Sequence, residues 1–245
     1  MIHTEEIEYQ LGNTTYRGFI AHDKSNSNPK PAVIIAPDWS GRNGMFCKKA
    51  EQLAGLGYVG FAIDMYGNAK TGKTTAEKMA LFEPVISNRG QVTERMLAAY
   101  KALLTRPQVD TSRIGAIGYC FGGLCVLDLA RSGADVVGVV SCHGILTAPE
   151  MTPCKKIQSK ILALHGYEDP MVPPAQVNQF AQEMTKKKVD WQIHMYGQTQ
   201  HAFTNPEAND DALGLHYNPT ADKRSWLSAE LFLSEVLKAP ISRKR

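Results

Sequence analysis

The chain has 245 residues, of which 43% are hydrophobic and 21% charged, and its formal net charge is +3. This composition predicts a globular protein with a sizeable core, and so mild a charge gives no reason to expect nucleic acid as a partner. The sequence contains no apolar run long enough for a transmembrane helix, and its acidic beginning, "MIHTEEIEYQ", differs from a signal peptide.

The cysteines are scattered along the chain and odd in number, since there are five of them. Because they lack the CxxC spacing of metal sites, we expect free thiols in a reducing compartment and therefore a cytoplasmic protein. Cys120 needs separate treatment. The other four are expected to be small buried hydrophobes: Cys47, Cys125, Cys142 and Cys154.

The first predicted elements form a β-hairpin at a sheet edge. Its strands are "EIEYQL" (6–11) and "TTYRGFIAH" (14–22), and a turn-rich loop follows over 22–31. After this loop, short apolar runs alternate with longer helical stretches. The apolar runs are 32–37, 58–64, 113–119, 136–142, 160–166 and 191–196, and the predicted helices are 44–56, 74–82, 90–106, 121–132, 174–187 and 220–238.

Continuous Val/Ile/Leu runs separated by helices predict a parallel sheet that helices cover on both faces. We therefore expect an α/β fold with a mostly parallel central sheet, antiparallel N-terminal edge strands and one domain over residues 1–245. Folds of this class bind ligands beyond the carboxyl ends of their strands. The residues that directly follow each strand are therefore the functional candidates.

Cys120 directly follows the apolar run 113–119, in "GYCFGG", and a predicted helix begins after it. The flanking glycines give the space in which a strand and a helix can cross closely around a nucleophile. A helix N-terminus also favours the thiolate, which is the nucleophilic form of cysteine. The same pattern fits a small buried cysteine in a tight turn, so on its own it does not decide between the two.

Two later strand ends supply the base and the orienting acid that a nucleophile needs. The run 160–166 is followed by "EDPMVPP", with Glu168 and Asp169 as candidate acids, and the run 191–196 is followed by "GQTQHAF", with His201. The order cysteine, acid, histidine, with one residue in each loop, is that of α/β-hydrolases.

The motifs "GYCFGG", "HGYEDPMVP" and "YGQTQHAF" resemble those of the dienelactone hydrolase family. The resemblance covers nearly the whole chain and implies the α/β-hydrolase fold, with Cys120, His201 and Asp169 as a catalytic triad. It also implies that the backbone N–H groups of Phe121 and Trp39 form the oxyanion hole.

Two positions depart from the family pattern. Asp38, in "APDWSG", stands where the family carries a glutamate that holds the resting thiol, so the resemblance implies a thiol-gating or substrate-binding role for it. The family also binds a substrate carboxylate through arginines. One of them comes just after the loop that carries the catalytic histidine (here the histidine loop, 197–203), where this chain has Asn205. Arg89 and Arg95 are other candidates for that contact, which the sequence does not place.

A second hypothesis is nucleotide binding, because Gly67–Thr74, "GNAKTGKT", matches the P-loop pattern after an apolar strand. A nucleotide hydrolase also needs a later strand that ends in a magnesium-binding Asp, and none of the later runs ends in this way. The helix after the loop is expected to stop before Pro84. We therefore interpret the segment as a polar loop over the strand ends.

Two further histidines, His143 and His165, also lie at strand ends. We expect both of them to be structural.

The sequence thus predicts a hydrolase that cleaves small-molecule esters or lactones through an acyl-enzyme intermediate on Cys120. No metal or organic cofactor is expected, no membrane association is expected, and the protein should be a monomer or a homodimer. Activated aryl esters and phosphotriesters are candidate promiscuous substrates, because their leaving groups need little acid assistance. A third hypothesis is a non-catalytic binding protein on the same fold.

Overall fold

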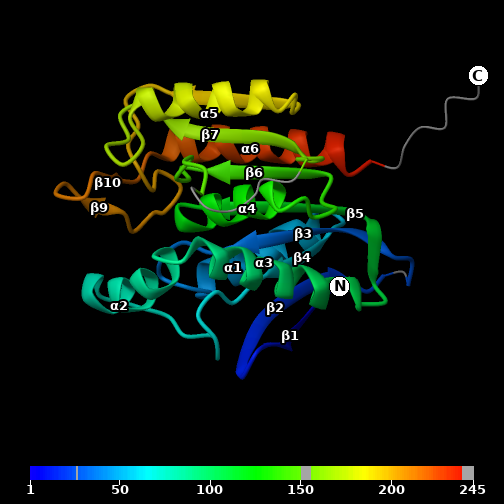
Figure 1. Cartoon of the computed structure of the whole chain (residues 1–245). Coiled ribbons are helices and arrows are strands. Elements are labelled where there is room, and N and C mark those ends of the chain that lie inside the picture. The colour runs from blue at the N-terminus through cyan, green and yellow to red at the C-terminus, as the bar shows by residue number, and fades with distance from the viewer. Residues whose placement is uncertain (26, 150–155, 239–245) are drawn as a thin grey trace, which may run out of the picture.

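The computed structural model describes residues 1–25, 27–149 and 156–238 (Figure 1). Its centre is an eight-stranded sheet with the order β1-β2-β4-β3-β5-β6-β7-β8. The strands β3 to β8 run parallel, while β1 and β2 pair antiparallel at one edge. The strands are β1 (Ile2–Leu11), β2 (Thr14–Asp23), β3 (Lys30–Ala36), β4 (Val59–Ala62), β5 (Val109–Tyr119), β6 (Gly138–Cys142), β7 (Lys160–Gly166) and β8 (Trp191–Tyr196).

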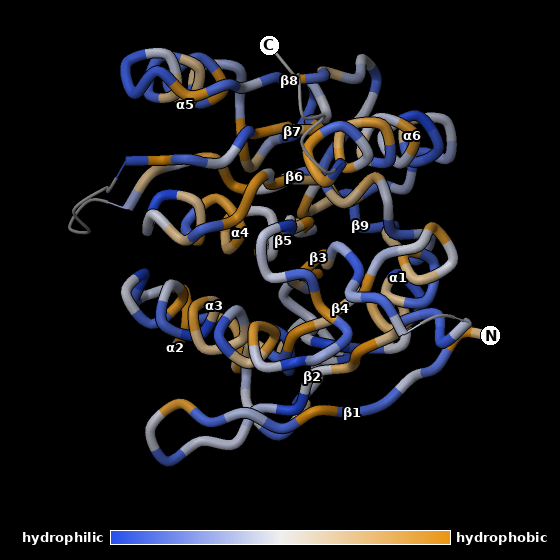
Figure 2. The backbone as a smooth tube through the Cα atoms, turned by 90° about the vertical axis from the view of Figure 1, so that its right-hand side faces the viewer, coloured by the Kyte–Doolittle hydropathy of each residue, from blue (hydrophilic) through white to orange (hydrophobic). Residues whose placement is uncertain are grey.

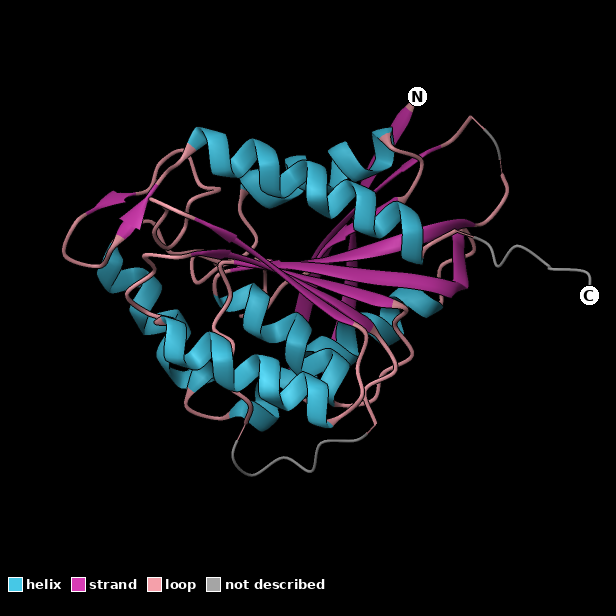
Figure 3. Ribbon diagram, turned by 90° about the horizontal axis from the view of Figure 1, so that it is seen from above, coloured by secondary structure: helices cyan, strands magenta, loops and turns pink. Residues whose placement is uncertain are grey.

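Helices cover both faces of this sheet (Figure 3). The core between α1, α6 and the sheet is one hydrophobic cluster, and α2, α3, α4 and α5 pack into a second cluster on the opposite face. The predicted fold class is therefore confirmed. The helices are α1 (Gly44–Gly55), α2 (Thr75–Ile86), α3 (Arg89–Leu104), α4 (Phe121–Arg131), α5 (Pro174–Lys186) and α6 (Pro219–Val236).

The inner parts of the central strands, such as 32–36 in β3 and 161–164 in β7, are apolar at every position because both of their faces are buried. In β3, Ile34 faces the core of α3 and α4, whereas its neighbours Val33 and Ile35 face the core of α1 and α6. Figure 2 shows the result: hydrophobic residues concentrate in the middle of the sheet, and the outer sides of the helices are hydrophilic. Since β5, β6, β7 and β8 are parallel, the loops after them meet at one edge of the sheet.

The helix α2 differs from the prediction, because it continues through Pro84 to Ile86 instead of stopping before the proline. Pro84 lies in the last turn, where it removes one hydrogen bond near the end of the helix, and Ser87 N–H still donates to the Glu83 carbonyl. A small hairpin, β9 (Asn209–Asp210) with β10 (Leu215–His216), was not predicted at all.

None of the helices in the described ranges has both the length and the hydrophobicity needed to cross a lipid bilayer. The thiols of Cys47, Cys120, Cys125 and Cys142 are free, and Cys154 lies outside the described residues.

Candidate active site

Cys120 sits at the junction between β5 and α4 in a backbone conformation that L-residues rarely adopt. Its φ is 53° and its ψ is −115°, so the residue is in strained backbone between the strand and the helix. The crossing is so close that a Cβ on Gly118 would overlap the carbonyl oxygen of Gly122, and a Cβ on Gly122 would overlap that of Ala36. Only glycine fits at these two positions, which is the local reason why this sequence forms the sharp strand-to-helix turn around Cys120, called the nucleophile elbow.

Asp169 and His201 meet through a hydrogen bond of 2.7 Å between Asp169 Oδ2 and His201 Nδ1. Both side chains are fully buried. The second carboxylate oxygen of Asp169 accepts the backbone N–H of Met171 at 2.8 Å, so the acid is fixed from two sides. Glu168, the competing acid in the sequence, is exposed.

The backbone of His201 is held by the small hairpin that the sequence did not predict. His201 N–H donates to the Gly214 carbonyl at 3.1 Å, and its own carbonyl accepts from His216 N–H at 3.0 Å. This pairing explains why β10 forms beside the loop, since residue 201 serves as an additional bridge partner of Leu215.

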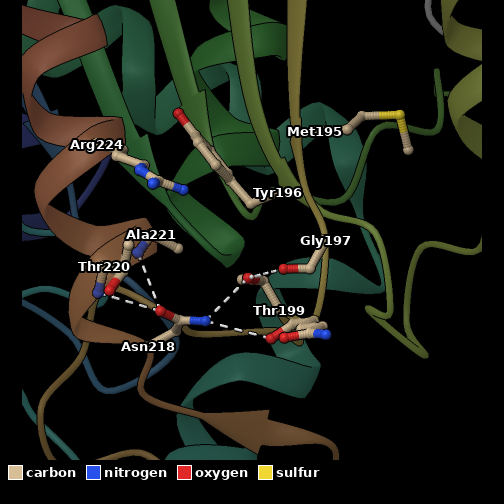
Figure 4. A pocket seen from close by; sticks show the side chains of 9 residues that line it. Met195, Tyr196, Gly197, Thr199, Asn218, Thr220, Ala221 and Arg224 are labelled. Atoms are coloured by element: carbon tan, nitrogen blue, oxygen red, sulfur yellow. Dashed lines mark hydrogen bonds between the residues drawn. The ribbon is translucent and has the colours of Figure 1, made fainter.

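Asn218 fastens the same loop to the start of α6. Its side-chain amide donates to the Gln198 carbonyl at 3.2 Å and to Thr199 Oγ1 at 3.1 Å (Figure 4). Its backbone N–H donates to the Phe203 carbonyl at 3.1 Å. These contacts line a polar hollow of about 330 Å³ that includes Arg224 and none of the predicted site residues. The histidine loop is therefore anchored on both sides of residue 201.

The protonation of His201 depends on its two neighbours. Burial lowers the pKa of His201, but the charge of Cys120 and the hydrogen bond to Asp169 raise it well above its usual range. Nε2 of the ring is buried and does not form a hydrogen bond of good geometry with the thiol, although the two groups are close enough to interact electrostatically. Such contacts are often loose without substrate and tighten when it binds.

The backbone N–H groups of Phe121 and Trp39 both lack a hydrogen-bond partner among the described residues. Phe121 is the first residue of α4, where backbone N–H groups have no partner within the helix. Tyr66 braces both residues: its hydroxyl donates to the Trp39 carbonyl at 2.8 Å, and its ring stacks on Phe121 with a centroid separation of 6.4 Å. The sequence analysis did not identify this contact, because Tyr66 has no motif of its own beyond its place after the apolar run 58–64.

Asp38 is buried, and burial raises the pKa of its carboxyl. Its Oδ1 accepts the Ser40 backbone N–H at 2.8 Å and also the Ser40 hydroxyl. No hydrogen bond joins Asp38 to Cys120 in the part of the chain that the structure describes. The thiol-gating or substrate-binding role that the family resemblance implies for Asp38 therefore stays a prediction.

The two arginines considered for a substrate carboxylate are engaged elsewhere. Arg89 donates to both oxygens of Asp128, at 2.7 and 2.8 Å, and Arg95 donates to the Met65 carbonyl at 2.6 Å. Asn205 uses its side-chain oxygen to accept the Glu207 N–H at 3.0 Å.

The segment Gly67–Thr74 does not form a phosphate cradle, because two carboxylates already bind its N–H groups. The carboxylate of Asp64 accepts the N–H groups of Gly67 and Ala69 at 2.9 and 2.7 Å. Farther on, Glu77 accepts the N–H groups of Lys73 and Thr74 at 2.8 and 3.1 Å, and the Thr74 hydroxyl caps α2. The match to the P-loop pattern is therefore a structural turn and a helix cap.

Comparisons with known proteins point to one family. The family model described as "Dienelactone hydrolase family" matches residues 16–237. The chain is similar to the structure of the dienelactone hydrolase-like promiscuous phosphotriesterase P91 from metagenomic libraries, with 34% identity, coverage of 97% of this chain and 99% of the other, and a TM-score of 0.92.

The chain is also similar to two curated relatives. A putative carboxymethylenebutenolidase of Synechocystis is 27% identical over 220 residues, which are 84% of this chain and 87% of the relative. An uncharacterized protein of Caenorhabditis elegans, K02A2.1, is 38% identical over 150 residues, covering 60% of this chain and 95% of its own length.

Proposed function

The chain belongs to the dienelactone hydrolase family, and on that premise we propose that it hydrolyses carboxylic esters or lactones with Cys120 as the nucleophile. The observation that carries the proposal is the buried pair of Asp169 and His201, whose free Nε2 lies beside a cysteine in an elbow conformation. An acid that fixes one ring nitrogen leaves the other free to exchange a proton with the nucleophile and the leaving group.

In the first half of the reaction, the thiolate of Cys120 attacks the carbonyl carbon, and the carbonyl π electrons move to oxygen. The N–H groups of Phe121 and Trp39 stabilise that oxyanion, because they are positioned before the charge develops. As the oxyanion collapses, the bond to the alcohol oxygen breaks, and this oxygen takes the proton from His201 Nε2. The acyl group remains on sulfur as a thioester.

In the second half, water attacks the thioester, and His201 accepts a proton from that water. Collapse of the second oxyanion breaks the carbon–sulfur bond and releases the carboxylic acid, with the thiolate of Cys120 restored beside a protonated His201. Asp169 holds the ring in the tautomer that this cycle needs and stabilises the imidazolium. These steps require no metal or organic cofactor, and a small-molecule substrate in the cytoplasm suits the free thiol.

Mass spectrometry after mixing the protein with a panel of p-nitrophenyl esters tests the proposal. We expect an acyl adduct on the peptide that contains Cys120, and turnover that is lost in Cys120→Ala. Cys47→Ala is a matched control, because Cys47 is another partly exposed free thiol and lies outside the site. Full activity of Cys120→Ala, or no turnover of any ester, would refute the thiol mechanism, and the second result would favour a non-catalytic binding role.

A second candidate activity is cleavage of aryl phosphotriesters, which the similarity to the promiscuous phosphotriesterase P91 favours. The thiolate would attack phosphorus and displace the aryloxide, whose low basicity removes the need for acid assistance, and water would then cleave the phosphorus–sulfur bond. Release of p-nitrophenolate from a p-nitrophenyl phosphotriester at more than the Cys120→Ala rate supports this activity. Equal rates for the two proteins would exclude it.

A further inference from the structure

His143 connects the nucleophile elbow to the histidine loop. It directly follows β6, is 2% exposed, and has a φ of 38°, which lies in the left-handed region. The backbone N–H of Cys120 is shared between the Cys142 carbonyl at 3.0 Å and Nδ1 of His143, which accepts it at 3.1 Å. Nε2 of His143 lies 2.8 Å from the hydroxyl oxygen of Thr204. Thr204 follows His201 by three residues, so one imidazole ring contacts the loops that carry both reacting side chains.

The hydrogen bonds define the tautomer of His143. Because Nδ1 accepts the N–H of Cys120, the ring proton is on Nε2, which therefore donates to Thr204. The ring also meets His201 edge to face, with centroids 5.3 Å apart. A backbone strained at both Cys120 and His143 persists only where the surrounding contacts hold it in place.

We propose that His143 is a positioning residue that fixes the elbow of Cys120 relative to the His201 loop, and that it acts in the neutral form through its bond to Thr204. This inference rests on the proposed thiol mechanism, because its purpose is to keep the sulfur of Cys120 and Nε2 of His201 in reach of each other. A misplacement of catalytic groups by about 1 Å can cost roughly a hundredfold in rate.

The surroundings of His143 favour its neutral form. Burial lowers the pKa of His143 well below its usual value, and the neighbouring imidazoles of His201 and His165 act in the same direction. The other titratable groups that face it are Cys120 and Tyr119. A protonated ring would turn an Nδ1–H donor against the N–H of Cys120 and place a second positive charge beside His201.

The test compares variants of the two partners. Thr204→Val removes the hydroxyl, and Thr204→Ser restores it. His143→Asn keeps an acceptor near the Nδ1 position, tolerates positive φ and loses the bond to Thr204. We expect Thr204→Val and His143→Asn each to lower kcat roughly tenfold with little change in KM. The double variant should lose no more than either single one, because both substitutions remove the same link.

A second measurement does not depend on a substrate. Alkylation of Cys120 by iodoacetamide over a range of pH reports formation of the thiolate–imidazolium pair with His201. The midpoint of this pH profile should move to higher pH in Thr204→Val and stay at the wild-type value in Thr204→Ser. Val139→Ala, in the buried part of β6, is a matched control that should lower thermal stability without moving this midpoint.

The outcomes separate this inference from the proposed function. If Thr204→Val and His143→Asn keep the wild-type midpoint and kcat, or if their losses only follow thermal stability as in Val139→Ala, the positioning role is wrong while the thiol mechanism stands. Additive losses in the double variant would also refute a shared link. If the wild-type protein forms no acyl adduct but the alkylation midpoint still shifts, the positioning role stands and the hydrolytic proposal fails.

Discussion

Gly122 is the position at which one added methyl group should disturb both halves of the proposed oxyanion hole. It lies in the first turn of α4, two residues after Cys120, and its Cα faces the end of β3. A Cβ at this position would lie 2.0 Å from the carbonyl oxygen of Ala36 and 2.6 Å from that of Pro37, whereas Cβ atoms stay at least 3.0 Å from other heavy atoms. Both neighbours are backbone atoms, so no side-chain rotation relieves the overlap, and the segments must separate by about 1.0 Å (3.0 minus 2.0).

This separation would act on catalysis through chain connectivity. Phe121 precedes Gly122 directly, and Trp39 follows Pro37 by two residues, so moving α4 away from β3 moves the two N–H groups apart. Overpacking of this kind costs about 1–3 kcal/mol of stability. Displacement of an oxyanion donor by nearly 1 Å costs about a hundredfold in rate. We therefore expect Gly122→Ala to lower kcat/KM about a hundredfold.

The assay is kcat/KM on a p-nitrophenyl ester, together with unfolding in urea. Gly55→Ala is the matched control, because Gly55 ends α1 and a Cβ there meets nothing within 4 Å. It should leave activity unchanged and, since alanine favours helix over glycine by up to about 1 kcal/mol, should not lower stability. A folded Gly122→Ala protein with wild-type kcat/KM would refute the reasoning, because the backbone would then have absorbed the methyl group without moving the site.

Two further predictions concern buried carboxylates. Asp169→Asn should lower kcat by about three to four orders of magnitude, because the amide favours the wrong tautomer of His201. Burial lowers the pKa of His201, but Cys120 and Asp169 raise it more, so that the pKa is about 10. The wild-type kcat/KM should therefore stay level through neutral pH. It should fall only at alkaline pH, where His201 loses the proton that the leaving group needs. Asp169→Asn should move this basic midpoint to lower pH, and an unmoved midpoint would contradict the assignment. Asp64 accepts four backbone N–H groups, two on each oxygen. Asp64→Asn turns one oxygen into a donor and should cost about 2–6 kcal/mol in urea unfolding, while wild-type protein and variant alike show no saturable ATP–magnesium binding in equilibrium dialysis. Saturable binding by the wild-type protein would instead support the nucleotide hypothesis.

The alternation of apolar runs and helices was sufficient to predict the sheet, because strands buried on both faces carry an unbroken apolar pattern. The same reasoning placed Cys120, Asp169 and His201 after three of the parallel strands, β5, β7 and β8, and parallel strands bring such positions to one edge. What the pattern could not predict is the support of the loop that carries His201. The strands β9 and β10 have two residues each and pair with each other, while Leu215 of β10 also bridges residue 201, so no local periodicity marks them.

Sequence motifs also do not determine which hydrogen-bond partner a polar group has. The P-loop pattern in Gly67–Thr74 predicts backbone N–H groups that donate to an anion, and the anion is the carboxylate of Asp64. Asp64 ends the apolar run 58–64, and nothing in its local sequence marks it as this acceptor. At "DWS", in contrast, a local signal was available, because an Asp two residues before Ser commonly accepts that residue's backbone N–H, as Asp38 does with Ser40.

The ion pair of Arg89 explains why Asn205, which stands where the family has an arginine, matters for the substrate. Arg89 binds both oxygens of Asp128, whose side chain is 1% exposed, and the two residues are 39 positions apart in the chain. Removing the guanidinium would leave this buried carboxylate with only the longer contact of 3.3 Å from Arg131 to its Oδ1, at a cost of up to about 3–5 kcal/mol. A substrate carboxylate at an open site would return less than this, so it would not recruit Arg89 from the scaffold. Arg89 therefore does not replace the arginine that the family carries at the position of Asn205. An ester substrate without a carboxylate does not need that arginine.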